Sequence, residues 1–493
     1  MVKGKSNTKT LKSLIVVHDN HQKGNVFPLG AGYIASMLKT KNVDVDIFCM
    51  DVFHYTSTNL REKINSSCYD IVLMGFMVPR FKKTVREVCR VIKDSIDKNC
   101  WFVLGGYGPS AIPEYIIEET GADIICIGEA DLTIIDLVKC KKKEITIDTI
   151  SGIIYRDPSS NKIISNKRRE KNKKLDEIPF PLWEAFPMQL YIDNLKFAGM
   201  KDGDKAFPII SSRGCTDRCS FCFRLESGIR ARSVDNVIKE MKELNEKYGV
   251  NYYFFCDELA VFSKKRILQL TKGIEEELPG VHYRMDCRVT VFDDDIAKAL
   301  KKSGCVFLNI GFESSSQKVL DMMCKRATVE QNIAAAELAN KYGIGMGINI
   351  IWGMPGDCEE SLRGNAEFIK KYNQYDQIRT IRPVTPYPGS PLYYLALEKN
   401  FLSGPQDFFN RFKNSDRIMV NFTEMSIGSI YKILLEVNTD LIYDHFKNTT
   451  NNMNAAKKMV EDLANLYKNE DYIYTGPRQL DNNINLRVLT NVD

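Results

Sequence analysis

Three cysteines in one short segment are the residues of this sequence best suited to do chemistry. Cys215, Cys219 and Cys222 follow a C-x3-C-x2-C spacing. Three thiolates at this spacing can bind three irons of a cubane 4Fe-4S cluster, which normally takes four cysteines. The fourth iron then has no protein ligand and can bind a substrate or cofactor. A structural zinc site is the alternative, but zinc takes four closed ligands and no second cysteine pair or histidine cluster follows in the sequence.

Further residues with chemical potential come after the triplet, each at the end of a predicted strand. Asp257-Glu258 and Glu313-Ser314 bring carboxylates, and Arg288 brings a guanidinium. A carboxylate makes charge-assisted hydrogen bonds to an ammonium group, and a guanidinium makes them to a carboxylate. Taken singly, the carboxylates are explained by helix N-caps or surface ion pairs, and Arg288 by a structural salt bridge. Their joint order behind the cysteines favours one shared site.

The strands that must position these residues alternate with helical patterns from residue 208 onward. The predicted strands cover residues 208–211, 252–256, 283–287, 306–310, 346–351 and 379–384. Six parallel βα units predict a partial TIM-type (β/α)6 barrel, whose active site lies at the carboxyl ends of the strands. The cysteine triplet follows the first of these strands, where the barrel rule places chemistry.

A second alternating pattern occupies the N-terminal part of the chain. Its short apolar runs cover residues 13–17, 43–49, 71–77, 101–104 and 124–127, with helical stretches such as 30–39 and 84–96 between them. This α/β rhythm predicts a Rossmann-like, doubly wound parallel sheet with its ligand at the carboxyl edge. Gly75, Gly105, Gly106 and Gly128 stand at that edge, where glycine lets a bulky ligand approach the backbone. The NAD fingerprint fails because the glycine-rich run follows a late strand.

These patterns divide the chain into four expected segments. They are a Rossmann-like domain over residues 1–148, a linker over 149–204 with a hairpin at 150–164, the barrel over 205–400 and a C-terminal helical region over 401–493. The strongest helical patterns of the last segment are at 430–445 and 455–467.

Composition narrows the class of protein. The 493 residues are 44% hydrophobic, which is typical of globular chains, and the net charge of +5 predicts no strong attraction to nucleic acid or anionic membranes. No apolar run approaches the roughly 18 residues needed to span a bilayer. Eleven of the 14 cysteines show no regular spacing, which indicates a reducing compartment rather than a disulfide scaffold. We therefore expect a cytoplasmic protein without a membrane span.

With an aromatic residue before its last cysteine, the triplet resembles the signature of the radical S-adenosylmethionine (SAM) superfamily. The segments 311–314, 353–356 and 386–391 resemble further motifs of that superfamily. The resemblance implies that Cys215, Cys219 and Cys222 bind a 4Fe-4S cluster that reductively cleaves SAM to a 5′-deoxyadenosyl radical. The SAM-binding residues that it implies are Phe221, Asp257, Glu258, Arg288, Glu313, Ser314 and Gly353.

The N-terminal part resembles the cobalamin (B12)-binding domain that precedes the barrel in one group of this superfamily. Asp19-Asn-His21-Gln-Lys-Gly24 has the Asp-x-His-x-x-Gly form in which a histidine binds cobalt and the aspartate orients it. The cobalamin-binding residues that the resemblance implies are Asp19, His21, Gly24, Leu29, Gly75, Phe76, Gly105, Gly106, Gly128 and Glu129. Two alternatives stay open: His21 is a loop histidine at the corrin edge or in solvent, or the domain is retained for architecture alone.

Together the resemblances imply a cobalamin-dependent radical SAM enzyme, with methylation of an unactivated carbon or phosphorus via methylcobalamin as the leading hypothesis. The substrate would be a small molecule, a peptide or a lipid, and an external donor such as flavodoxin or ferredoxin would supply electrons. One alternative is a non-methylating cobalamin-dependent cyclase or rearrangement enzyme. Another, from a different class, is a sensor that binds cobalamin or SAM without turnover.

Overall fold

The computed structural model describes residues 10–20 and 25–469. The chain divides into two compact units, Met1–Leu190 and Tyr191–Asp493. This division falls inside the segment 149–204 that the sequence analysis treats as a linker. Within the described ranges, no helix is both long and apolar enough to cross a membrane.

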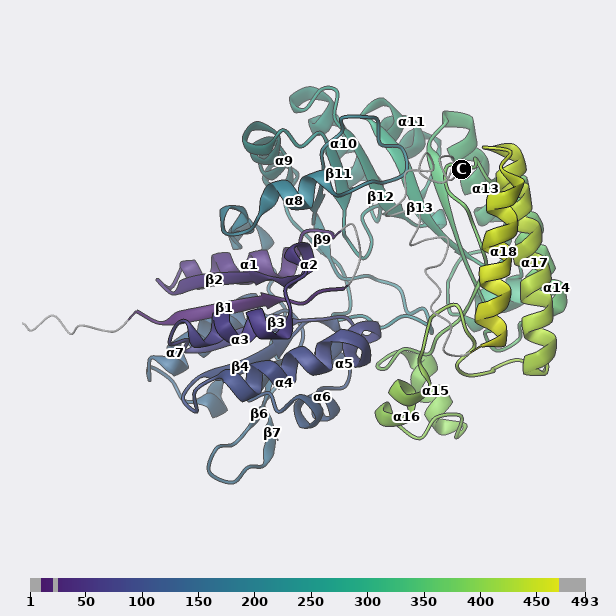
Figure 1. The fold of residues 1–493 in the computed structure, drawn as a ribbon. Helices are drawn as coiled ribbons and strands as arrows, with labels where there is room; N and C mark the ends of the chain where they lie inside the picture. The colour runs from purple at the N-terminus through teal and green to yellow at the C-terminus, as the bar shows by residue number, and fades with distance from the viewer. Residues whose placement is uncertain (1–9, 21–24, 470–493) are drawn as a thin grey trace, which may run out of the picture. The chain divides into compact units, whose positions relative to one another are not determined.

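Unit 1 contains one sheet, whose strands in the described residues run in the order β2-β1-β3-β4-β5-β6-β7 (Figure 1). The strands are β1 (Lys12–Val17), β2 (Asp44–Cys49), β3 (Ile71–Gly75), β4 (Trp101–Gly105), β5 (Ile124–Cys126), β6 (Ile153–Arg156) and β7 (Ile163–Ser165). Strands β1 to β5 are parallel, and β6 and β7 add to the edge in antiparallel orientation. The four central residues of β1 are all buried, as expected of a parallel strand covered on both faces.

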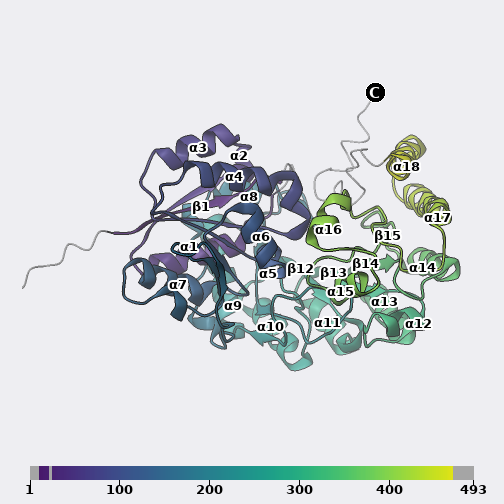
Figure 2. The ribbon, with the colours of Figure 1, turned by 90° about the horizontal axis from the view of Figure 1, so that it is seen from below.

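Helices cover both faces of this sheet, which confirms the predicted doubly wound fold. They are α1 (Leu29–Lys39), α2 (Met50–Phe53), α3 (Ser57–Asn65), α4 (Arg86–Ser95), α5 (Tyr107–Ala111), α6 (Pro113–Thr120) and α7 (Asp131–Lys141). Helices α1 and α7 pack together on one face, and α4 packs with α3 and α6 on the other (Figure 2).

Two details of unit 1 differ from the predicted pattern. The third strand ends at Gly75 rather than at residue 77, because the chain leaves the sheet through a 3-10 turn (Val78–Arg80) and a π turn (Phe81–Val85) before α4. The hairpin predicted at 150–164 exists as β6 and β7, but β6 pairs with β5. The first part of the expected linker therefore belongs to the sheet.

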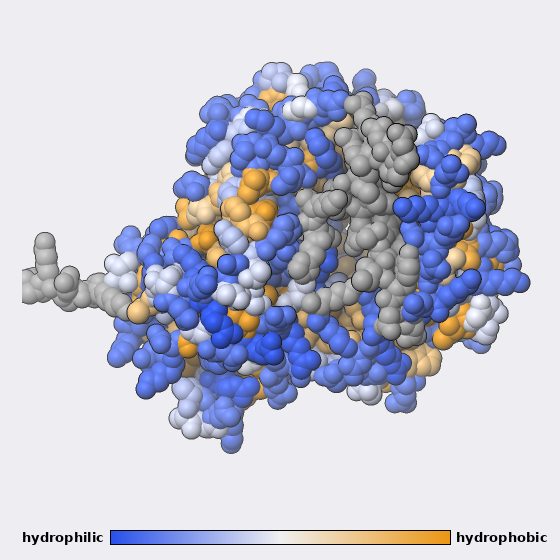
Figure 3. All heavy atoms as spheres, in the orientation of Figure 1, coloured by the Kyte–Doolittle hydropathy of each residue, from blue (hydrophilic) through white to orange (hydrophobic). Residues whose placement is uncertain are grey.

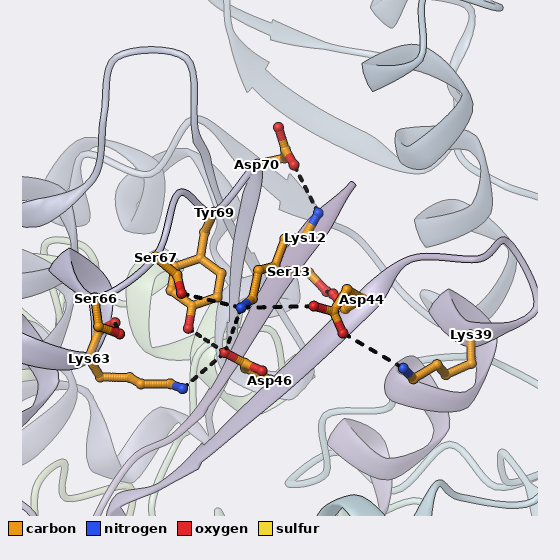
Figure 4. Close-up of polar contacts among 10 residues, drawn as sticks. All are labelled: Lys12, Ser13, Lys39, Asp44, Asp46, Lys63, Ser66, Ser67, Tyr69 and Asp70. Atoms are coloured by element: carbon orange, nitrogen blue, oxygen red, sulfur yellow. Dashed lines mark hydrogen bonds and ion pairs between the residues drawn. The ribbon is translucent and has the colours of Figure 1, made fainter. Parts of the chain in front are cut away.

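The amino edge of this sheet carries a network of charged side chains (Figure 4). The Lys12 ammonium lies 3.4 Å from Asp46 and 3.8 Å from Asp44, and it lies over the ring of Tyr69. The Tyr69 hydroxyl donates to Asp46 over 2.6 Å, and Lys63 also pairs with Asp46. This network links β1, β2 and the segment before β3 at the edge opposite to the one where ligands bind.

Unit 2 contains a parallel half-barrel, with described strands in the order β15-β14-β13-β12-β11-β8. The strands are β8 (Ala206–Ile209), β11 (Tyr252–Phe255), β12 (His282–Cys287), β13 (Cys305–Glu313), β14 (Gly345–Trp352) and β15 (Arg382–Pro383). All five neighbouring pairs are parallel, which confirms the predicted partial barrel. Two very short strands, β9 (Ser212–Arg213) and β10 (Arg230–Ala231), form a separate ribbon.

Helices follow the strands of the half-barrel and continue beyond it. They are α8 (Met188–Asp193), which crosses the division between the units, α9 (Val234–Tyr248), α10 (Lys264–Glu277), α11 (Asp294–Lys302), α12 (Gln317–Met322), α13 (Val329–Tyr342), α14 (Glu359–Tyr372), α15 (Pro391–Glu398), α16 (Pro405–Arg411), α17 (Ile427–Asn448) and α18 (Met453–Lys468). Helices α17 and α18 pack on each other, and α17 packs on α14. Their outward face is mainly hydrophilic (Figure 3), as expected of amphipathic helices on a domain surface.

Candidate functional site

The cysteine segment is a closed loop at the carboxyl edge of the half-barrel. Strands β9 and β10 pair in antiparallel orientation and so close a loop of residues 214–229 directly after β8. Gly214 begins this loop with a φ of 84°, and a Cβ there would lie 2.2 Å from the Gly228 carbonyl oxygen. Only glycine fits such an approach, so the backbone itself holds the loop closed.

The three cysteines lie along this loop. Cys219 is 8% exposed, and burial raises the pKa of its thiol to about 11. A thiolate at this position therefore requires a bound cation. Among the described residues, no three His, Cys, Asp or Glu side chains converge on a single metal position. Cysteines that each bind a different iron of a cubane do not have to converge, and a set of thiols alone is the donor set of such clusters.

Asp257 lies at the end of β11 as predicted, but its carboxylate is occupied within the protein. Ser211 donates to it from its backbone N–H over 3.0 Å and from its hydroxyl over 2.8 Å, and the Ser212 hydroxyl donates as well. The side chain thus ties β11 to the start of the cysteine loop. Glu258 is the next residue. The predicted contact between its carboxylate and SAM stays a prediction.

Arg288 pairs with Asp217, which stands between the first two cysteines. The two side chains are 2.7 Å apart, and both are largely buried. The salt bridge considered for Arg288 therefore exists, and it is made to the cysteine loop. Its Nε atom is buried and has no hydrogen-bond partner within the described residues, which leaves one donor for a bound group.

The predicted Gly-x-Glu-Ser segment ends β13, where the register of the sheet shifts between Gly311 and Glu313. Glu313 has a φ of 64° and pairs with Lys325 over 3.0 Å. Ser314 is 1% exposed, and its hydroxyl accepts from the Ser316 N–H over 3.1 Å. Both side chains thus have partners in the protein, next to the cysteine loop.

Phe221 and the 353–356 turn meet beside the loop. The ring of Phe221 packs on a buried apolar cluster that includes Met354, Val384 and Leu392. The backbone N–H of Leu392 donates to the Ser220 carbonyl over 2.8 Å, so the proline-rich segment 386–391 also ends at the loop. Phe221 and the turn that begins at Gly353 therefore belong to one region of unit 2.

The carboxyl edge of the unit 1 sheet is a second region of close packing. A Cβ at Gly75 would lie 3.3 Å from the Gly105 carbonyl oxygen, and one at Gly108 would lie 2.6 Å from the Phe76 ring. Phe76 is 5% exposed and stacks on Phe81, so its ring belongs to the core. The backbone N–H of Gly128 donates to Ser110 over 3.1 Å. Leu29 begins α1 and is also buried, while Gly106 (φ 88°) and the half-buried Glu129 lie in loops at this edge.

Two members of the predicted cobalt motif, His21 and Gly24, lie outside the described residues. Asp19 is described, and its carboxylate lies 2.8 Å from Nδ1 of His54, a histidine of a different loop. His18, directly after β1, is 8% exposed, and Asn20 and the Gly75 backbone are among the groups that act on its ring. Burial lowers the pKa of His18 to about 4, so its imidazole is neutral near pH 7.

Three candidate site residues were not predicted from the sequence: His18, Lys325 and Asp357. Asp357 accepts from the N–H groups of Gly353 and Met354 over 2.9 and 3.0 Å, and burial raises its pKa to about 6. An aspartate directly after a glycine turn is a recognisable signal for such local bonds. No local pattern marks Lys325, because its partner lies on another element.

A half-barrel with a three-cysteine loop at its carboxyl edge, in one chain with a doubly wound sheet, defines a class of metal-dependent enzymes. The model of the radical SAM superfamily matches residues 209–369, and the model of the B12 binding domain matches residues 18–138. An uncharacterized methyltransferase of Pyrococcus horikoshii is 30% identical over 380 residues, which cover 76% of this chain and 79% of that protein. The chain therefore belongs to the radical SAM superfamily, in the group that carries a B12-binding domain.

The chain is also similar to a named cyclase and, in its fold, to a solved methyltransferase structure. An anaerobic magnesium-protoporphyrin IX monomethyl ester cyclase of Rubrivivax gelatinosus is 25% identical over 447 residues, which cover 85% of this chain and 78% of the cyclase. The radical SAM methyltransferase TsrM from Kitasatospora setae, solved with cobalamin and a 4Fe-4S cluster, matches with a TM-score of 0.64 and 18% identity. That match covers 79% of this chain and 75% of TsrM and shows a shared fold.

Proposed function

We propose that this protein is a cobalamin-dependent radical SAM enzyme that methylates an unactivated carbon or phosphorus. The observation that carries the proposal is the thiol-only loop of Cys215, Cys219 and Cys222 at the carboxyl edge of a half-barrel, in a chain that also has a B12-binding domain. When bound, the cluster supplies reductive cleavage of SAM, and cobalamin supplies a carrier for the methyl group.

In this proposal, residues of unit 2 bind the cluster and SAM. Cys215, Cys219 and Cys222 hold the cluster, and Asp257 and Arg288 fix the loop that carries them. Phe221, Glu258, Glu313, Ser314 and Gly353 are the remaining residues proposed for SAM. Cys219 is buried, whereas Cys215 is half-buried and Cys222 is exposed, so electrostatic interactions are strongest on the Cys219 side of the loop. An external one-electron donor of the flavodoxin or ferredoxin type completes the system.

In unit 1, we propose that the glycine-rich carboxyl edge binds cobalamin. Gly75, Gly105, Gly106 and Gly128 provide backbone without side chains there, and Leu29, Phe76 and Glu129 support or line that edge. The Asp19 carboxylate also binds Nδ1 of His54, and His18 is a second buried histidine beside this edge. His18 and His21 are therefore both candidates for the lower face of the corrin.

Incubation with SAM that carries a labelled methyl group tests the proposal. Anaerobically reconstituted protein with a chemical reductant should form 5′-deoxyadenosine, and candidate substrates should acquire the label. Formation of 5′-deoxyadenosine with a changed but unlabelled substrate would instead support a cyclase or rearrangement, which the similarity to the magnesium-protoporphyrin cyclase favours as the second candidate. Absence of 5′-deoxyadenosine under these conditions would contradict both.

A further inference from the structure

A buried ion pair lies beside the cysteine loop, and the proposed reaction gives its cation no role. Lys325 Nζ is 3.0 Å from Glu313 Oε1, and the two side chains are 8% and 11% exposed. Glu313 Oε1 is the only hydrogen-bond acceptor of this ammonium in the described residues. Two of its N–H groups are therefore left without protein acceptors there. Burying a charged pair is costly unless something further compensates it.

Strand β13 has a glycine, Gly311, where the ion pair of Lys325 and Glu313 packs against it. A Cβ at Gly311 would lie 2.5 Å from Glu313 Oε1 and 2.8 Å from Lys325 Nζ. Atoms at such distances would overlap, so any side chain at position 311 would displace the ion pair. The glycine of this segment is thus explained by the charged groups that pack over it.

Residues with an unfavourable backbone conformation surround the ion pair of Lys325 and Glu313. Glu313, Cys324 and Arg326 have φ values of 64°, 54° and 55°, which place three non-glycine residues in the left-handed region. This conformation is unfavourable for a residue with a side chain, and strain of this kind persists only where surrounding structure enforces it. Two of the three flank Lys325 directly, so the strained turn presents the lysine side chain.

The same turn is bonded to the cysteine loop. The Ser220 N–H donates to the Met323 carbonyl over 2.9 Å, and Ser220 stands next to Cys219. The Ser220 hydroxyl also donates to the Met322 carbonyl over 3.4 Å. These two bonds hold the turn that carries Lys325 beside Cys219, and both the ammonium and the thiol are buried.

We propose that Lys325 is a positioning residue that raises the reduction potential of the cluster bound by Cys215, Cys219 and Cys222. This inference rests on the proposed function. One electron from an external donor of the flavodoxin or ferredoxin type adds one negative charge to the cluster, and no bond forms or breaks in that step. A fixed ammonium beside one thiolate stabilises the reduced form, and in a buried site this interaction is weakly screened.

Redox titration of the reconstituted full-length protein, followed by the electron paramagnetic resonance of the reduced cluster and carried out without SAM, tests the inference. Lys325→Met removes the cation and leaves Glu313, so the equilibrium constant for reduction should fall about tenfold, which is about 59 mV for a one-electron couple. Glu313→Gln removes the anion and leaves the cation, so the potential should rise. Lys325→Arg keeps the charge and should stay within about threefold of the wild-type equilibrium constant.

Opposite signs for Lys325→Met and Glu313→Gln are the signature of an electrostatic role. A role in packing alone would lower the melting temperature of both variants without moving the potential, and that result would overturn the inference. A shift in the apparent affinity for SAM at an unchanged potential would also overturn it, because the ammonium would then act on SAM. If Lys325→Met fails to hold a cluster, Glu313→Gln decides: a raised potential supports the inference, and an unchanged or lowered one overturns it.

Failure of the proposed function and failure of the role of Lys325 give different results. Wild-type protein that binds no cluster under reducing, anaerobic reconstitution would contradict the proposed function. Wild-type protein that binds the cluster, with potentials that the two substitutions do not move, would contradict the role of Lys325 alone.

Discussion

At the scale of single residues, Asp257 anchors the loop that carries the three cysteines. Its oxygens accept three hydrogen bonds from Ser211 and Ser212, the residues that lead into the cysteine loop. Full burial raises the pKa of Asp257, and these hydrogen bonds favour its ionised form. The loop geometry is thus fixed from β11, before any cofactor binds.

We expect Asp257→Ala to destabilise the protein by about 3 kcal/mol, because two hydroxyls and one N–H group would lose a charged acceptor. The free energy of unfolding in urea and the iron content per chain after reconstitution would both fall. Glu258→Ala is the matched control and should retain iron, with a smaller loss of stability. Full iron content in Asp257→Ala would show that the loop does not depend on this anchor.

The chemistry predicted for this site rests on a local sequence pattern, whereas the contacts within the site are nonlocal. The cysteine spacing is local, so the loop could be recognised from eight consecutive residues. The partners of Arg288 and Glu313 could not, since Asp217 and Lys325 approach them only through the fold. Motif order placed Asp257 at the end of a strand, but it did not reveal the hydrogen bonds from Ser211 and Ser212, and SAM binding by Asp257 stays a prediction.

At the scale of elements, the open edge of the half-barrel is closed by a helix. Asn438 of α17 accepts from the Ile381 N–H over 2.8 Å and donates to the Ile381 carbonyl over 3.0 Å, as a neighbouring strand would do. Its amide thereby satisfies two buried backbone groups beside β15. The C-terminal helices are thus part of the barrel architecture.

Asn438→Ala should lower the free energy of unfolding by about 2 kcal/mol, because a buried N–H and a buried C=O would lose their partners. Hydrogen exchange at the Ile381 amide should accelerate correspondingly. Asn448→Ala, at the exposed end of the same helix, should change stability by less than about 0.5 kcal/mol. Unchanged exchange at Ile381 in Asn438→Ala would refute the role of α17 as an edge cover.

Apolar runs predicted most strands of both sheets, since buried parallel strands read as continuous hydrophobic segments. The last strand of the half-barrel is the exception. Residues 379–384 were predicted as a strand, whereas β15 pairs only over Arg382–Pro383. The reason is nonlocal: Asn438 bonds the backbone at Ile381, and the Arg382 guanidinium lies 2.6 Å from the Asp416 carboxylate.

At the scale of the whole molecule, each unit contains a buried histidine that resists protonation. Burial lowers the pKa of His18 in unit 1 and of His445 in unit 2 to about 4. His445 is 1% exposed and packs between the rings of Tyr375 and Phe446. Lowering the pH should therefore destabilise both units.

Stability should fall as the pH is lowered from about 6.5 to 4, because in this window the unfolded chain binds a proton at each histidine and the folded chain does not. Each histidine contributes up to about 3 kcal/mol to this loss. His445→Phe should show a smaller loss of unfolding free energy between pH 7 and pH 4.5 than the wild type. Equal slopes for His445→Phe and the wild type would contradict the assignment.

The central claim is that one chain binds two cofactors, and metal analysis tests it most directly. Protein purified anaerobically and reconstituted with iron, sulfide and hydroxocobalamin should contain about four irons and one cobalt per chain, with cluster and corrin bands in its absorption spectrum. Cys219→Ala should lose iron and retain cobalt, whereas Cys324→Ala, an exposed cysteine outside the triplet, should retain both. Iron without cobalt in the wild-type protein would contradict the account.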